Sequence, residues 1–175
     1  MKILLVAVQS IDGKITKRDN PHQHSWASKE DQEFFYDLIS KSNLIVMGRK
    51  TYEAAKDHIR LKEGKLRVVL TSSPQKYKDK EVMGQLEFVN MSPEELVEML
   101  KNRNFKELLL VGGGDINTIF LEKGLVDEMY ITLEPQLFGK GKAIASITKD
   151  LDIALISHKK LNKRGTLLLH YKINN

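Results

Sequence analysis

The sequence predicts an α/β domain with a mostly parallel, twisted sheet, helices on both faces and an antiparallel edge at the C-terminus. Apolar runs typical of buried strands alternate with segments of helical periodicity along most of the chain. Two extended segments, 153–161 and 166–173, then follow each other directly, as in a hairpin. The chain has 175 residues, without a repeat or a linker, which favours one domain over 1–175.

Local patterns predict each element in turn. Residues 1–8 form an apolar run that we expect to be the first strand, and Ser28 begins a helix that ends near Ser42. Ser92 and Pro93 begin another helix, and a short one is expected over 115–123, before Gly124. The remaining strands of the parallel part are expected at 44–47, 66–70, 87–89, 108–111 and 127–134.

Composition excludes several kinds of protein and site. There is no cysteine, so disulfides and thiolate zinc sites are excluded, and His22 and His24 lack further ligands for a metal. The first apolar run is too short for a signal peptide or a membrane span, so we expect a cytoplasmic protein. The net charge of +5 fits an anionic ligand. The basic runs 76–80 and 159–164 lack aromatic stacking residues, which favours solvated loops over nucleic-acid binding. The oligomeric state stays open, a homodimer included.

The triple glycine Gly112-Gly113-Gly114 is the most informative motif. It follows the buried strand 108–111 and precedes a helix that begins at Asp115. The first N–H groups of a helix are unpaired and lie at the positive end of its dipole, so a phosphate could bind there. A tight turn without a ligand explains the same glycines, and Asn117 occupies the position of the third glycine in the usual dinucleotide fingerprint.

Two more strands end in residues that suit a phosphate. Gly48-Arg49-Lys50-Thr51 places two cations in the first turn of a helix, which is the wrong sign unless an anion binds there. Thr71-Ser72-Ser73 supplies hydroxyl groups after the next strand. Ligands bind beyond the carboxyl ends of strands in such sheets, so these ends and the triple glycine are expected to form one site.

Asp31 lies on the apolar face of the helix at 28–42, one turn before Phe35. Two interpretations stay open from the residues alone. Asp31 stands three residues after Ser28, so it could complete a capping box. A partly buried carboxyl group could instead be tuned for proton transfer.

Taken together, these motifs resemble the dihydrofolate reductase superfamily, which includes the reductase domain at the C-terminus of bacterial riboflavin-biosynthesis deaminase-reductases. The resemblance covers nearly the whole chain and depends on the strings 46–51, 70–74 and 111–114. It implies NADPH as the cofactor, with phosphates at Arg49, Lys50 and Thr51 and the ribose 2′-phosphate near Ser72. The implied cofactor-binding residues are Gly48, Arg49, Lys50, Thr51, Thr71, Ser72, Ser73, Gly112, Gly113, Gly114 and Asp115.

The resemblance also implies a substrate pocket. Trp26, Asp31 and Phe35 are similar to the residues around the pterin ring of dihydrofolate reductases, where the acid assists protonation. Thr132 corresponds to a threonine that hydrogen-bonds this acid. Asp31 and Thr132 are therefore the implied catalytic residues.

Other residues are more similar to the riboflavin branch than to folate enzymes. Lys65 stands where folate enzymes carry the arginine that binds the glutamate tail, with Arg67 two residues later, and Asn117 replaces an expected tyrosine. The strings 10–15, 124–128 and 135–141 resemble the riboflavin branch, which implies that Asp12 and Lys14 lie on the substrate side. The implied activity is NADPH-dependent reduction of a phosphoribosylamino-pyrimidine; dihydrofolate reduction and a non-catalytic nucleotide-binding domain are the alternatives.

Overall fold

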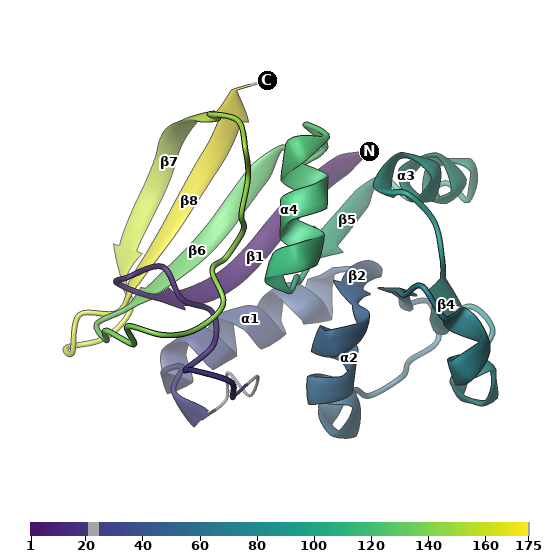
Figure 1. The fold of residues 1–175 in the computed structure, drawn as a ribbon, viewed down its shortest axis with the longest axis horizontal. Helices are drawn as coiled ribbons and strands as arrows, with labels where there is room; N and C mark the ends of the chain where they lie inside the picture. Colours follow the sequence, from purple (N-terminus) through teal and green to yellow (C-terminus); the bar gives the residue numbers. More distant parts are fainter. Residues whose placement is uncertain (21–24, 175) are drawn as a thin grey trace.

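The computed structural model describes residues 1–20 and 25–174, so His22 and His24 lie outside the described part of the chain. Within this part, eight strands form one sheet in the order β4-β3-β2-β5-β1-β6-β8-β7 (Figure 1). The pairs from β4 to β6 are parallel, and β8 and β7 are antiparallel to their neighbours. The predicted α/β class and its antiparallel C-terminal edge are therefore confirmed. The strands are β1 (Lys2–Ser10), β2 (Leu44–Gly48), β3 (Leu66–Leu70), β4 (Leu86–Val89), β5 (Glu107–Leu110), β6 (Glu128–Glu134), β7 (Asp152–Lys160) and β8 (Leu167–Asn174).

Helices cover both faces of this sheet, as the pattern predicts. The α-helices are α1 (Lys29–Lys41), α2 (Arg49–Ala55), α3 (Pro93–Asn102) and α4 (Gly114–Glu122), and the short 3-10 helices are η2 (Lys56–His58) and η3 (Pro74–Lys80). The start of α3 is a full capping box, in which Ser92 and Glu95 each accept a backbone N–H of the other. None of the described helices is long and apolar enough to cross a membrane.

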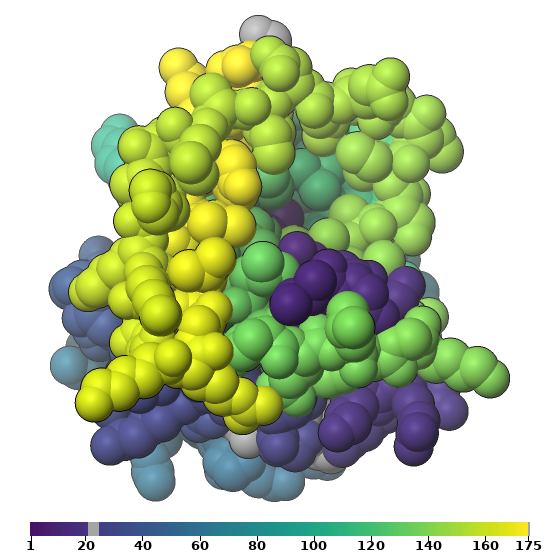
Figure 2. All heavy atoms as spheres, turned by 90° about the vertical axis from the view of Figure 1, so that its left-hand side faces the viewer, coloured from purple at the N-terminus to yellow at the C-terminus, as the bar shows by residue number. Residues whose placement is uncertain are grey.

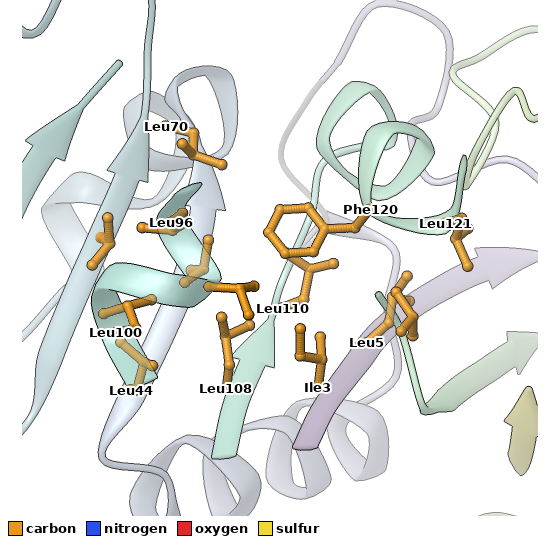
Figure 3. Close-up of a cluster of buried hydrophobic side chains, with 14 of the residues drawn as sticks. Ile3, Leu5, Leu44, Leu70, Leu96, Leu100, Leu108, Leu110, Phe120 and Leu121 are labelled. Atoms are coloured by element: carbon orange, nitrogen blue, oxygen red, sulfur yellow. The ribbon is translucent and has the colours of Figure 1, made fainter. Parts of the chain in front are cut away.

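Alternating residues of the buried strands face two separate cores, because strand side chains point to opposite faces in turn. On one face, Leu108 and Leu110 pack with Leu96 and Leu100 of α3 and with Phe120 of α4 (Figure 3). On the other face lie α1 and α2, whose apolar residues pack on a core that includes Val6, Ile45, Met47, Val69 and Leu109. Full burial of each such side chain contributes roughly 1.5–3 kcal/mol, which explains why the central strands are apolar on both faces.

The sheet order brings the three expected strand ends together. β2 lies between β3 and β5, with Gly48 paired to Leu70 and Val46 paired to Leu110. Parallel strands end at the same edge of a sheet, so the segments that follow Gly48, Leu70 and Leu110 meet there. The topology thus places these loops around a common space.

The loop after β1 packs on a distant part of the chain. Backbone N–H groups of Ile11, Ile15 and Arg18 donate to carbonyls in the segment 136–142. Figure 2 shows this loop, in purple, against that segment, in green. Together they form a wall beside the carboxyl ends of the strands.

Candidate active site

One cavity of about 1450 Å³ lies at the carboxyl ends of β2, β3 and β5. It continues along the sheet to α1, so it connects the three strand ends with the buried acid of that helix. Most of the residues that the sequence assigned to a site line this cavity. They are Asp31, Phe35, Gly48, Arg49, Lys50, Thr51, Thr71, Ser72, Gly112, Gly113, Gly114 and Asp115. Of the described residues assigned there, five do not line it: Asp12, Lys14, Trp26, Ser73 and Thr132.

The glycines at the strand ends allow the surrounding backbone to come close. A Cβ on Gly114 would stand 2.5 Å from the carbonyl oxygen of Ala143, which is backbone and cannot turn aside. The peptide bond between Gly112 and Gly113 is cis. Gly113 is the N-cap of α4 and has no side chain to cap it, so among the described residues the first N–H groups of this helix, which border the cavity, have no side-chain cap.

The polar side chains at the start of α2 and after β3 are cationic or hydroxylic, and Asp115 of α4 is an acid beside them. Arg49 and Lys50 begin α2, whose first turn contains no acid, and Lys50 forms an ion pair of 3.1 Å with Asp115 on α4. After β3, the Thr71 hydroxyl accepts the Ser73 N–H at 3.2 Å, which shapes the turn and leaves Ser72 exposed at the cavity. This donor set suits an anionic group.

Asp31 occupies the other end of the cavity, in the first turn of α1. Its backbone N–H donates to the hydroxyl of the N-cap Ser28 at 3.3 Å, so half of the expected capping box is present. Its side chain is buried, with 6% exposed. Burial raises the pKa of the Asp31 carboxyl to about 6, and the charge of Glu134 adds to the effect. The carboxyl group therefore carries a proton under mildly acidic conditions.

Thr132, on β6, lies against the Asp31 carboxyl and lowers its pKa, against the larger effect of burial. Within the described residues, the Thr132 hydroxyl is buried and has no partner at full hydrogen-bond geometry. The structure thus brings Asp31 and Thr132 together, as the resemblance implies. Thr132 acts on the acid from behind rather than on the cavity.

The two aromatic residues assigned to the ring pocket differ in position. Phe35 lines the cavity one turn after Asp31. Trp26 instead packs edge-on against Phe138, with ring centroids 4.9 Å apart, and its carbonyl accepts from Gln136 at 2.9 Å. Its role at a substrate stays a prediction, as does that of Phe35.

Asp12 holds the wall beside the cavity together. Its carboxylate accepts the Ser10 hydroxyl at 2.6 Å and the N–H groups of Phe138 and Gly139 at 3.0 and 2.7 Å. These donors, the Ser10 hydroxyl first, lower the pKa of Asp12 to about 2. Lys14 is half-buried in the same turn, where its backbone N–H donates to the Ser10 hydroxyl at 3.0 Å. The substrate roles of Asp12 and Lys14 stay predictions.

Three residues that the sequence reasoning did not assign to the site are conspicuous for their burial. Arg67 lines the cavity from β3, is only 6% exposed, and has a buried Nη1 without a partner in the described part of the chain. Asn117 donates to the Ile144 carbonyl at 2.9 Å, while its buried Oδ1 faces Gly112. Glu134 is a carboxyl group that is 1% exposed, at the end of β6. A charged residue inside an apolar strand, as at Arg67, is the signal that could have revealed it.

Comparisons with known proteins agree with this architecture. The family model of the RibD C-terminal domain matches residues 1–167. Protein YwjB of Bacillus subtilis is 26% identical over 175 residues, which cover 97% of this chain and 95% of YwjB. A pyrimidine reductase-like protein from Corynebacterium diphtheriae superposes with a TM-score of 0.81 at 16% identity, over 99% of this chain and 92% of that one.

Dihydrofolate reductase from Enterococcus faecalis, solved in complex with NADP(H), superposes with a TM-score of 0.69 at 18% identity, over 99% of this chain and 97% of that one. At such identities the solved structures establish the fold, a single α/β domain like that of dihydrofolate reductase. The family match extends over nearly the whole chain. The protein therefore belongs to the RibD C-terminal domain family, whose fold it shares with dihydrofolate reductase.

Proposed function

We propose that this protein is an NADPH-dependent reductase of an aminopyrimidine or pterin-like substrate. The observation that carries the proposal is the continuity of one cavity from the three strand ends to the buried carboxyl group of Asp31. One end offers donors for an anionic dinucleotide, and the other offers a group that can give up a proton near neutral pH. A reductase that adds a hydride and a proton needs both.

The residues at the strand ends suit the cofactor. Arg49 and Ser72 would hold the 2′-phosphate that distinguishes NADPH, and the uncapped start of α4 at Gly113 would hold the pyrophosphate. Lys50, Thr51 and the remaining glycines would complete the contacts. When bound, NADPH supplies a hydride, and the chain binds and orients it.

Asp31 would supply the proton. A carboxyl group with a pKa of about 6 is largely protonated at pH 5 and still partly protonated at pH 7, which suits a general acid. Thr132 would keep the carboxyl group turned toward the cavity, and Phe35 would pack against the substrate ring.

The best candidate substrate is 5-amino-6-(5-phosphoribosylamino)uracil, because the strings 10–15, 124–128 and 135–141 resemble the riboflavin branch. Arg67 would bind an anionic substituent such as the phosphate. Dihydrofolate is the second candidate, favoured by the folate-like acid Asp31. The loss of NADPH absorbance, measured in parallel with both compounds, tests the proposal.

Turnover of the phosphoribosyl compound alone would assign the riboflavin branch, and turnover of dihydrofolate alone would assign a folate reductase. If NADPH stabilises the protein against heat but neither compound is reduced, a non-catalytic nucleotide-binding domain becomes the better interpretation.

A further inference from the structure

The turn between β7 and β8 is bonded to the start of α1, although the two lie far apart in the sequence. Asn162 in this turn donates from Nδ2 to Glu30 Oε2 at 3.0 Å, across 132 residues. Glu30 directly precedes Asp31 in the first turn of α1. Figure 1 shows the hairpin of β7 and β8 at the edge of the sheet, with its turn toward that end of α1. The C-terminal hairpin therefore contacts the helix that carries the candidate acid.

The hydrogen bonds of the Asn162 side chain fix its orientation. Its Oδ1 accepts the N–H groups of Gly165 and Thr166 at 3.1 and 3.2 Å, so the acceptor side of the amide faces the turn. Its Nδ2 donates to the Thr166 hydroxyl at 3.0 Å and also to Glu30. An asparagine amide has two N–H donors, and both are used here. An asparagine that only shaped its own turn would not need the bond to Glu30.

The first turn of a helix depends on such outside partners, because its N–H groups have no intrahelical acceptor. In α1, Asp31 donates to the Ser28 hydroxyl at 3.3 Å and Gln32 to the Ser28 carbonyl at 3.1 Å, so both depend on the position of Ser28. The Ser28 N–H in turn donates to Glu134 at 2.7 Å, and Glu134 is hydrogen-bonded to the Thr166 hydroxyl at 2.8 Å. A second chain of hydrogen bonds thus joins the same turn to the same end of α1.

We propose that Asn162 is a positioning residue for Asp31: its hydrogen bond to Glu30 keeps the first turn of α1, and with it the Asp31 carboxyl group, in place at the cavity. The effect on turnover rests on the proposed function, whereas the effect on the helix does not. A misplacement of about 1 Å at a reacting group can cost about a hundredfold in rate, so a bond remote from the substrate can matter for catalysis.

The variant Asn162→Asp separates the link to α1 from the turn. It keeps an acceptor for the two N–H groups of the turn but places a second oxygen before Glu30, so this hydrogen bond is lost. We expect kcat to fall roughly tenfold to a hundredfold, with an unchanged Kd for NADPH, which would bind at the other end of the cavity. Hydrogen exchange of the Ser28 and Gln32 N–H groups should accelerate.

A second substitution should restore the bond with its direction reversed. Glu30→Gln supplies an amide donor from α1, so the double variant Asn162→Asp, Glu30→Gln should recover most of the lost kcat. Glu30→Gln alone keeps an oxygen acceptor for Asn162 and should lose far less than Asn162→Asp. The matched control is Asn174→Asp, which makes the same change to an amide that binds Asp152 at 2.9 Å at the other end of the hairpin. It should leave kcat and the exchange at the start of α1 unchanged.

Wild-type kcat in Asn162→Asp, an equal loss in Asn174→Asp, or a double variant that recovers nothing would each overturn the inference. If Asn162→Asp does not fold, Glu30→Ala breaks the same hydrogen bond from α1, and the same loss is expected there. If the wild-type protein reduces neither candidate substrate, the proposed function fails and hydrogen exchange alone decides. Faster exchange at Ser28 and Gln32 in Asn162→Asp, but not in Asn174→Asp, would then support the inference, and unchanged exchange would refute it.

Discussion

Lys65 donates from Nζ to the carbonyl oxygen of Ser40 at 3.0 Å, and also to that of Ile39, so its cation is bound to the last turn of α1. Carbonyl groups at a helix C-terminus lack internal partners and lie at the negative end of the dipole, which makes this position favourable for a cation. Burial, followed by the charges of Arg67 and Lys62, lowers the pKa of Lys65. The Lys65 cation therefore stabilises the end of α1, and Arg67 is the buried cation that lines the cavity.

Replacement of Arg67 by methionine should weaken substrate binding and stabilise the protein. Burial lowers the pKa of Arg67, and its Nη1 has no partner in the described chain, so removal of the charge should raise the free energy of unfolding by about 1–3 kcal/mol. KM for the phosphoribosyl substrate should rise roughly tenfold to a thousandfold. Urea unfolding and steady-state kinetics measure the two effects. Arg60→Met, at an exposed position on the same cavity, is the control, and an equal rise in KM there would contradict a specific role for Arg67.

Asp31→Asn should retain NADPH affinity and lose about a hundredfold to ten-thousandfold in kcat. The wild-type rate should be constant below pH 6 and fall tenfold per unit above it, because the protonated carboxyl group is the active form and its pKa is about 6. The variant should show no such limb. Fluorescence titration with NADPH separates binding from turnover. Wild-type turnover in Asp31→Asn would leave only the helix-cap interpretation, in which the Asp31 N–H bonds to Ser28.

The same acid should make stability depend on pH. The pKa of Asp31 is raised from 3.8 to about 6 in the folded protein. The contribution of this group to the free energy of unfolding is therefore greatest below pH 4 and declines as the pH rises to 6. The loss amounts to about 3 kcal/mol, since one unit corresponds to about 1.4 kcal/mol. Asp31→Asn should therefore gain stability over the wild type between pH 4 and pH 7 in urea unfolding. A difference between the two proteins that is independent of pH would show that Asp31 is not perturbed by burial.

Sequence reasoning located the features that depend on short-range pattern. Buried strands that end in glycine or hydroxyl residues, as at Gly48 and Thr71, are visible because an apolar run and the turn after it are local, and parallel pairing then brings them together. The fold class is confirmed for the same reason. Asp31 was visible because helical spacing places it with Phe35.

The structural roles that sequence reasoning did not find depend on contacts between distant parts of the chain. In the sequence, Glu134 is only the last residue of a strand. The structure shows that it binds Ser28 and Thr166, which are 106 and 32 residues away. Asp12 looks like half of an Asp-Gly turn, although its carboxylate binds a loop 126 residues later. No local pattern records such partners.

Asp12→Ala should loosen the wall beside the cavity. Loss of the carboxylate leaves the N–H groups of Phe138 and Gly139 without an acceptor, so their hydrogen exchange should accelerate. In the wild-type protein the ionised Asp12 carboxylate contributes its full stabilisation above pH 3.8, which is its pKa in the unfolded chain. This stabilisation is lost only as the pH falls through about 2, its pKa in the folded protein. Asp19→Ala, at an exposed position of the same loop, is the control. A higher KM without faster exchange would instead support the substrate role that the resemblance implies for Asp12.

Arg49→Ala and Ser72→Ala should distinguish the two nicotinamide cofactors. Only NADPH carries a 2′-phosphate, and a hydrogen bond to such a charged group contributes about 1.5–3 kcal/mol, so its Kd should rise by roughly tenfold to a hundredfold in either variant. The Kd for NADH should change far less, because its ribose carries no 2′-phosphate for these side chains to contact. Lys56→Ala removes an exposed cation that pairs with Glu53 at the end of the same helical segment, and should affect neither cofactor. Equal losses for NADPH and NADH would place the 2′-phosphate elsewhere in the cavity and leave Arg49 as a contact to the pyrophosphate that both cofactors share.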